Sequence, residues 1–175
     1  MVGDHALLIT EEVLIVNGGQ FNCRHEGMTW GGSSLRRYLN GEFLNSFDSV
    51  DRTRIRKTYV VDTDNPWWYS GRSGENTMDK IFILSIDEVL RYFGDSGQLE
   101  NRPEGVRWIN DQYNAYRIAT DSQGTPLSWW LRTSGRYIRL IASICVTGDL
   151  NIYAQSVTTD GGGARPALWL NLVNS

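Results

Sequence analysis

The chain contains few of the residues on which metal binding and covalent chemistry usually depend. Two of its 175 residues are cysteine and two are histidine. Cys23 and Cys145 stand in neither a CxxC nor a Cys/His spacing, so neither a zinc site nor a redox pair is indicated, and nothing around them requires a disulfide. His5 and His25 have no neighbour that would mark a general base. We therefore expect no catalytic residue, no metal and no cofactor.

Long apolar runs and charge of a single sign are missing as well. No stretch approaches the roughly 20 apolar residues of a membrane-spanning helix, and the first residues lack the order of a signal peptide. The 17 basic and 20 acidic residues are spread along the chain and leave a formal net charge of -3. We therefore expect no nucleic-acid partner and no direct insertion into a membrane.

Aromatic residues and glycine are abundant instead. Seven Trp, eight Tyr and eighteen Gly predict a loop-rich architecture, because large rings bury area efficiently and glycine permits turns. The length suits one core, so residues 1–175 are predicted to form a single domain. The apolar run that begins at Ala6 comes so early that we expect this domain to be the C-terminal part of a longer protein.

Capping residues and hydrophobic spacing predict three helices. Ser33 and Ser34 precede apolar residues at helical spacing, while Ser85 and Glu88 form a capping box before a helix that ends at Gly94. The predicted helices cover residues 33–44, 48–55 and 85–93. Short apolar runs predict strands at 6–9, 58–61 and 81–84, and residues 94–128 are expected to be loop with one helical turn near 108–116.

The last fifty or so residues are predicted to be sheet, and side-chain patterning sets the register of one hairpin. A two-residue turn at Gly148 and Asp149 would mix apolar and polar side chains on both faces, whereas a three-residue turn ending at Gly148 separates them. In the second register Ser143 pairs with Asn151, and Cys145 pairs with Asp149.

The two faces of this hairpin then differ in character. The apolar face must be the core, and it consists of Ala142, Ile144, Leu150 and Ile152. The other face is small and polar, and it consists of Ser143, Cys145, Asp149, Asn151 and Tyr153. From composition alone, it is either a binding surface or an ordinary solvated sheet face.

Two arginines stand inside otherwise apolar strings. Trp129, Trp130 and Trp169 alternate with leucines and are predicted to lie mostly in the core. Arg132 and Arg165 are their neighbours, and a buried guanidinium group has to be paired and hydrogen-bonded. We expect each arginine to bind carbonyl groups or a carboxylate and to hold loops in place.

Five strings of the sequence, in this order, resemble a bacterial domain family of unassigned function. They are ALLIT, SSLRRYLNGEFLNSF, KIFILSIDEVLRYF, WWLRTSG and GGGARPALWLNL. The family looks like a branch of the C-type lectin-like fold, related to formylglycine-generating enzymes and to the variable proteins of diversity-generating retroelements. The resemblance implies an α+β fold with a twisted, mostly antiparallel sheet, two main helices and long loops. The family usually opens with a further strand of the form EW-x-VL, which is missing here, so we expect an incomplete N-terminal sheet edge.

Among these relatives the variable proteins offer the closest functional analogy. Formylglycine-generating enzymes work through cysteine chemistry near the C-terminus, whereas Cys145 stands alone in this part of the sequence. Calcium-binding lectins need an EPN or QPD tripeptide and a later WND. The segment from Trp108 to Asp111 resembles the WND, but the sequence contains neither tripeptide. In variable proteins, positions on a ligand-facing surface change between fixed core positions. Residues 136–160 fit that layout, because they lie between the WWLR and GGGARPALWL strings.

The resemblance therefore implies non-enzymatic recognition of a protein or glycan surface ligand, in a protein of the cell surface, a secreted protein or a phage-associated one. The oligomeric state stays open. The expected ligand contacts are Tyr137, Ile138, Arg139, Leu140, Ser143, Cys145, Thr147, Asp149, Asn151, Tyr153, Gln155 and Thr158.

Two alternatives remain. One is an enzyme, either a degenerate formylglycine-type oxidase or a glycan hydrolase that uses Asp62 and Asp64 as its carboxylate pair beside the aromatic platform of Trp67 and Trp68. The bland interpretation of that segment is a turn followed by packing tryptophans. The other alternative is a structural module of a bacterial surface protein.

Overall fold

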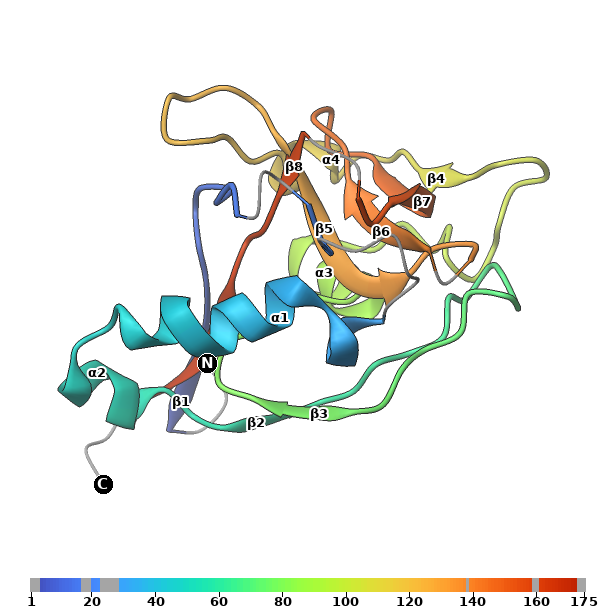
Figure 1. The fold of residues 1–175 in the computed structure, drawn as a ribbon. Helices are drawn as coiled ribbons and strands as arrows, with labels where there is room; N and C mark the ends of the chain where they lie inside the picture. The colour runs from blue at the N-terminus through green and yellow to red at the C-terminus, as the bar shows by residue number, and fades with distance from the viewer. Residues whose placement is uncertain (1–3, 17–19, 23–28, 138, 159–160, 173–175) are drawn as a thin grey trace.

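Three sheets and a few short helices form the mixed α+β fold of the computed structural model, which describes residues 4–16, 20–22, 29–137, 139–158 and 161–172 (Figure 1). The strands are β1 (His5–Ile9), β2 (Thr58–Val60), β3 (Thr77–Asp79), β4 (Trp108–Ile109), β5 (Ser128–Ser134), β6 (Leu140–Ile144), β7 (Leu150–Ser156), β8 (Gly162–Gly163) and β9 (Ala167–Asn171). β1 pairs with β9, and β2 pairs with β3. The largest sheet has the order β4-β7-β6-β5-β8 and is antiparallel except between β5 and β8.

The main helices begin where the sequence supplies a capping residue. The hydroxyls of Ser33 and Ser85 each accept a hydrogen bond from the N–H three residues later, and Glu88 completes a capping box by accepting from the Ser85 N–H. The helical segments are η2 (Trp30–Gly32), α1 (Ser34–Tyr38), η3 (Leu39–Phe43), α2 (Ser49–Arg54), α3 (Ile86–Phe93) and α4 (Asn114–Arg117). The three predicted helices are thus confirmed, the first as α1 continued by the π-helical turn η3.

The apolar run at 81–84 is buried but is not a strand, so that prediction is wrong. Phe82 exchanges two backbone hydrogen bonds with Ala167 of β9 and forms only an isolated bridge. Two residues later, the Leu84 carbonyl accepts from the N–H of Arg132 in β5 (2.9 Å). The run therefore crosses from one sheet to another, and an apolar run of four residues cannot distinguish such a crossing from a strand.

The predicted register of the β6–β7 hairpin is confirmed. Ser143 pairs with Asn151, and the Cys145 N–H donates to the Asp149 carbonyl at 2.9 Å. Gly148 closes the turn with a φ of +83°, and a Cβ there would lie 2.1 Å from the Asn114 carbonyl oxygen, so glycine is required twice over. The predicted core face, formed by Ala142, Ile144, Leu150 and Ile152, is fully buried.

Beyond this regular part, β7 contains a bulge that the sequence did not reveal. The pairing changes between Ser143–Asn151 and Ile141–Gln155, so three residues of β7 lie opposite one residue of β6. Ala154 has a φ of +92°, the one positive value of a non-glycine residue in the described part, and its N–H donates to the Asn151 side chain at 2.9 Å. A bulge changes the direction of side chains. Here Tyr153, the residue before Ala154, lies within the bulge and outside the regular β6–β7 pairing.

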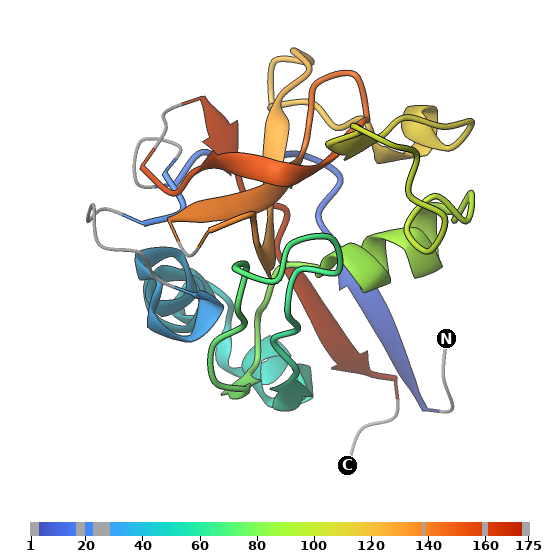
Figure 2. The same cartoon turned by 90° about the vertical axis from the view of Figure 1, so that its right-hand side faces the viewer.

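A continuous hydrophobic core joins these layers. Its largest fully buried side chains include the aromatic residues Phe21, Trp30, Trp129 and Trp130. Figure 2 shows the β1–β9 ribbon at one end of the molecule and the large sheet at the other, with α1 along one side. No helix in the described ranges is long and apolar enough to cross a membrane.

Candidate functional site

The residues that were predicted to contact a ligand divide into three groups. Tyr137, Arg139 and Thr147 are exposed, whereas Ser143 is fully buried. The partly buried group consists of Leu140, Cys145, Asp149, Asn151, Tyr153 and Thr158. Ile138 and the side chain of Gln155 lie outside the described part of the chain.

Ser143 was predicted on the displayed face, and this prediction is wrong. Ser143 is the cross-strand partner of Trp130, and both are 0% exposed. On the opposite face of the same strands, Trp129 and Ile144 pair and are equally buried. Both faces of the sheet are therefore covered at this level, and side-chain alternation cannot separate interior from surface where neither side meets water.

The turn end of the hairpin is tied to α4. The Asp149 carboxylate accepts hydrogen bonds from the Asn114 amide (2.9 Å) and from the Thr147 hydroxyl. Cys145 has a free thiol, and burial together with the negative charge of Asp149 raises the pKa of that thiol, so it stays protonated at neutral pH. The polar side chains of Asn114, Thr147 and Asp149 are thus hydrogen-bonded to one another.

The middle of β7, at Tyr153, joins a cluster that combines residues from distant parts of the sequence. We call it the arginine–aromatic cluster, and its members are Trp67, Trp68, Arg102, Arg107, Arg136, Tyr137 and Tyr153. The loops around 64–73 and 99–107 that supply four of them lie together at the right of Figure 1, beside β7.

Guanidinium groups and rings alternate within this cluster. The Arg102 Cζ lies 4.7 Å and 4.3 Å from the ring centroids of Trp67 and Trp68. The Arg136 Cζ lies 5.0 Å from Trp68, 5.0 Å from Tyr137 and 5.5 Å from Tyr153. Arg107 stacks on the same tyrosine at 4.8 Å, and the rings of Trp68 and Tyr153 meet edge to face with centroids 5.6 Å apart. Each arginine thus makes a cation–π contact.

Buried hydrogen bonds fix the loops that present these side chains. The Asn65 amide donates to the carbonyls of Ser134 (2.8 Å) and Ile152 (2.9 Å), which anchors the 64–73 loop to the end of β5 and to β7. The Asn65 side-chain oxygen also accepts from the Trp67 N–H. The Trp67 indole in turn donates to the Leu99 carbonyl at 2.8 Å and so joins the second loop.

The cluster carries positive charge that the protein does not neutralise locally. Within the described residues, no carboxylate lies within 4.0 Å of a guanidinium nitrogen of Arg102, Arg107 or Arg136. The Trp68 Nε1 is buried and has no hydrogen-bond partner in the same part of the chain. The cluster therefore presents guanidinium groups that have no acidic partner in the described chain, beside apolar ring faces.

Sequence reasoning found only part of this cluster. Tyr137 and Tyr153 were named as ligand contacts, and the tryptophan pair was considered as a sugar platform. Arg136 opens the candidate variable segment but was not singled out, and Arg102 and Arg107 were missed. The available signal was the pair of arginines in an otherwise Gly-, Asn- and Pro-rich loop.

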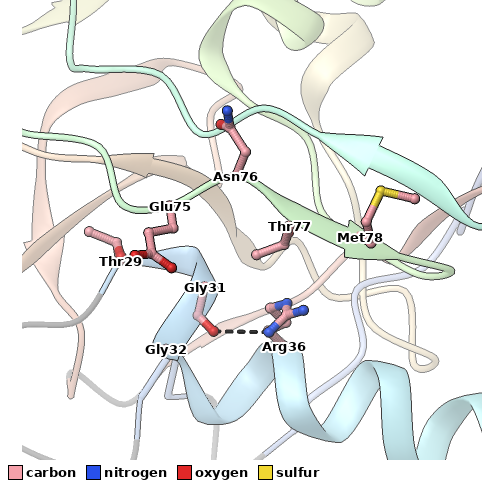
Figure 3. Close-up of a pocket in the computed structure, with 8 residues that line it drawn as sticks. All are labelled: Thr29, Gly31, Gly32, Arg36, Glu75, Asn76, Thr77 and Met78. Carbon is pink, nitrogen blue, oxygen red and sulfur yellow. Dashed lines mark hydrogen bonds between the residues drawn. The ribbon is translucent and has the colours of Figure 1, made fainter.

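A separate pocket of about 600 Å³ lies between α1 and β3 (Figure 3). Its most prominent charged group, Arg36, donates to Asp79 at 2.8 Å and to the Gly31 carbonyl at 3.0 Å. Asp79 also accepts from the Trp30 indole at 2.9 Å. Because these groups are already paired with one another, we assign them to holding η2, α1 and β3 together.

The alternative carboxylate pair has two different environments. Asp62 is 5% exposed, accepts from the Gly74 N–H at 2.9 Å, and has a raised pKa because burial disfavours its charge. Asp64 is exposed, and hydrogen bonds from the backbone and hydroxyl of Ser73 lower its pKa. The neighbouring indoles of Trp67 and Trp68 stack on Arg102.

The WIND string of residues 108–111, which resembles the WND of lectins, makes contacts within the protein. Asp111, which ends the WIND string, is ion-paired with Arg117 at 3.1 Å, and both side chains are almost completely buried. Its carboxylate also accepts from the Tyr113 N–H. These contacts fold the loop before α4 back on itself.

The arginines in apolar strings differ from each other. Arg132 has the expected partners, namely the carbonyls of Val61 and Ile83 and the carboxylate of Glu88. Arg165 donates to the Thr10 carbonyl and stacks on Trp129 at 5.0 Å, but its Nη1 has no partner among the described residues.

Trp169 departs from the predicted core placement. It is partly buried and packs edge to face on His5, with ring centroids 5.1 Å apart. The pairing of β1 with β9 explains this position, because Trp169 lies on a two-stranded ribbon at the margin of the molecule.

Comparison with known proteins identifies a family but no characterised relative. A family model described as a domain of unknown function (DUF6273) matches residues 3–172. No curated protein and no solved structure matches the chain. Because the family model covers nearly the whole sequence, this protein belongs to the DUF6273 family.

Proposed function

We propose that this domain recognises a ligand without transforming it, and that the arginine–aromatic cluster with the adjoining part of β7 is the contact surface. The observation that carries the proposal is the charge of the cluster. Three guanidinium groups alternate with four rings, and no carboxylate of the described residues lies within 4.0 Å of them. By contrast, Arg36, Arg117 and Arg132 each have an acidic partner.

The scaffold suits a recognition role. Tyrosines provide large contact areas at a low cost in side-chain entropy, and Tyr137 is 47% exposed. The buried bonds of Asn65 hold the supporting loop to the sheet. Substitutions at exposed positions usually change stability by less than about 0.5 kcal/mol, so exposed contact residues such as Arg107 and Tyr137 can be exchanged without refolding the domain.

A C-type lectin-like fold and diversification by a retroelement are the finer parts of this proposal. The pairing of β1 with β9, the mixed α+β architecture and the long loops support the first. The second predicts a reverse transcriptase gene nearby and a near-copy of the segment that encodes residues 136–160, differing mainly at template adenines. Sister sequences should then vary at Tyr137 and Tyr153 and keep a small residue at the buried Ser143.

Binding arrays with matched variants test the recognition role. The wild-type domain is applied to arrays of glycans and of surface proteins, beside the double variant Arg136→Gln/Tyr137→Ala. The control is Arg91→Gln/Tyr92→Ala on α3. It removes the same two chemical groups, and Tyr92 is similarly exposed (45%). We expect the first variant to lose the wild-type signals and the control to keep them. Equal signals from all three proteins would contradict the proposed contact surface.

A hydrolase using Asp62 and Asp64 is the second candidate, because their pKa values are shifted in opposite directions, as in an acid and nucleophile pair. It predicts release of reducing sugar from an oligosaccharide substrate, abolished by Asp62→Asn. Retention of full ligand binding by Asp62→Asn, without turnover in either protein, would favour recognition.

A further inference from the structure

We infer that the ligand of the arginine–aromatic cluster is an acidic glycan, whose carboxylates pair with Arg107 and Arg136 while its sugar rings pack on exposed aromatic faces. This inference rests on the proposed recognition function and specifies the class of ligand. It follows from which donors of the cluster are already used, from the planarity of the guanidinium group and from the rings nearby.

The three arginines differ in how many donors they have left. Arg102 is largely occupied, because its Nε and Nη2 both donate to the Val106 carbonyl, at 3.0 Å and 2.7 Å. Among the described residues, the Arg136 guanidinium group makes one long hydrogen bond, from Nη1 to the Tyr153 hydroxyl at 3.4 Å. Arg107 is exposed, and its structural contact is the stacking on Tyr153. Arg102 therefore supports the cluster, while Arg107 and Arg136 keep donors for a ligand.

The two available guanidinium groups flank one ring. Arg107 and Arg136 lie 4.8 Å and 5.5 Å from the centroid of Tyr153. A planar guanidinium group held on a ring presents its N–H fork edgewise, the geometry that a carboxylate accepts with both oxygens. Two such groups around one tyrosine suit a ligand that carries more than one carboxylate, and no carboxylate of the described chain fills that role.

The rings argue for a glycan among carboxylate-bearing ligands. Tyr137 and Trp108 are 47% and 51% exposed, and Trp108 follows Arg107 directly in the sequence. Trp108 also pairs with Asn151 of β7, two residues before Tyr153. Sugars present apolar C–H faces that pack flat on such rings, with hydroxyl groups at their edges for the remaining donors. Acidic peptides supply carboxylates on flexible stems but lack those rigid apolar faces.

The test uses acidic oligosaccharides whose charge can be removed without changing the rings. Trigalacturonate, a hyaluronan tetrasaccharide and sialyllactose are titrated into the domain in a calorimeter, each beside its methyl ester, with triglutamate as the peptide probe. We expect at least one acidic sugar to bind, and its methyl ester to bind about tenfold more weakly or worse, since charge-assisted hydrogen bonds are lost. Triglutamate should bind more weakly than the sugar.

Variants connect that binding to the named residues. Arg107→Gln and Arg136→Gln should each weaken binding of the acidic sugar about tenfold and leave the residual binding of the ester unchanged. Arg107→Lys should restore only part of it, because an ammonium group lacks the planar fork. Arg91→Gln on α3 is the charge-matched control. Arg107 has a single ring contact, so its variants fold even where the loss of Arg136 disturbs the loops.

Each other result overturns the inference and has its own meaning. Equal binding of acid and ester would show that the carboxylate does not contribute to binding, while glycan recognition would stand. Tighter binding of triglutamate would make the partner an acidic peptide. An equal loss of binding in Arg91→Gln would mean that the overall charge of the domain, and not the cluster, determines binding. If none of the three sugars bound while the arrays still showed signals dependent on Arg136, the acidic-glycan inference would fail and the recognition function would stand.

Discussion

Arg132 and Arg136 stand four residues apart at the end of β5, and the protein uses them in opposite ways. Arg132 is 3% exposed and satisfies its guanidinium group with two carbonyls and the carboxylate of Glu88. Arg136 is partly exposed, lies among three rings and has no acidic partner in the described chain. Every guanidinium nitrogen of Arg132 donates within the protein, so this group serves to hold the structure together. A guanidinium group that is supported by ring faces keeps its N–H donors available for a ligand.

The largest expected effect on stability comes from removing Arg132, the buried and fully paired arginine. Arg132→Ala should lower the free energy of unfolding by about 3 kcal/mol, because it strands the Glu88 carboxylate and leaves two carbonyls without their donor. Arg136→Gln should lower it by less than about 1 kcal/mol, since cation–π contacts near the surface are weak. Urea unfolding of both variants measures the difference. Similar losses would mean that the cluster is also a structural device and would weaken the recognition proposal.

The same contrast shows what could be predicted from the sequence. The partners of Arg132 were anticipated in kind, because a charge inside an apolar string has few physically acceptable solutions. The hairpin register was predictable because one register alone separates apolar from polar side chains. These features depend on local order and on burial, which the sequence encodes directly.

The arginine–aromatic cluster depends on information of another kind. It needs the loops of Trp68 and Arg102 to meet Tyr153, and the Asn65 hydrogen bonds that bring the first loop there span 69 and 87 residues. It also needs the bulge at Ala154, whose positive φ contradicts the local preference of alanine. Tertiary packing sets both features, so neither leaves a periodic signal along the chain.

A smaller effect, with a defined pH dependence, is expected at Asp62. Burial raises the pKa of this carboxyl in the folded protein, so its neutral form is favoured on folding. The stability that this provides is present in acid, below the usual pKa of aspartate, and is lost as the pH rises through the raised value. Asp62→Asn should therefore be more stable than the wild type at neutral pH and no more stable in acid. Urea unfolding at both pH values tests this, and a stability gain that persists in acid would point to packing instead of ionisation.

A small effect is expected for Ser143→Ala, and a comparison of substitutions at Ser143 and Tyr137 sharpens the distinction between the buried interior and the exposed surface. The Ser143 hydroxyl is buried and has no partner among the described residues, so Ser143→Ala removes an uncompensated polar group and should leave stability unchanged or raise it by up to about 1 kcal/mol. Ser143→Tyr should instead cost about 1–3 kcal/mol or more through overpacking between covered faces. Tyr137→Ser, at an exposed position of the same segment, should stay within about 0.5 kcal/mol of the wild type. Thermal unfolding of the three variants compares them directly.

A destabilising Ser143→Ala or a tolerated Ser143→Tyr would show that β6 displays this side chain after all, and the contact surface would then extend along the sheet beyond the cluster.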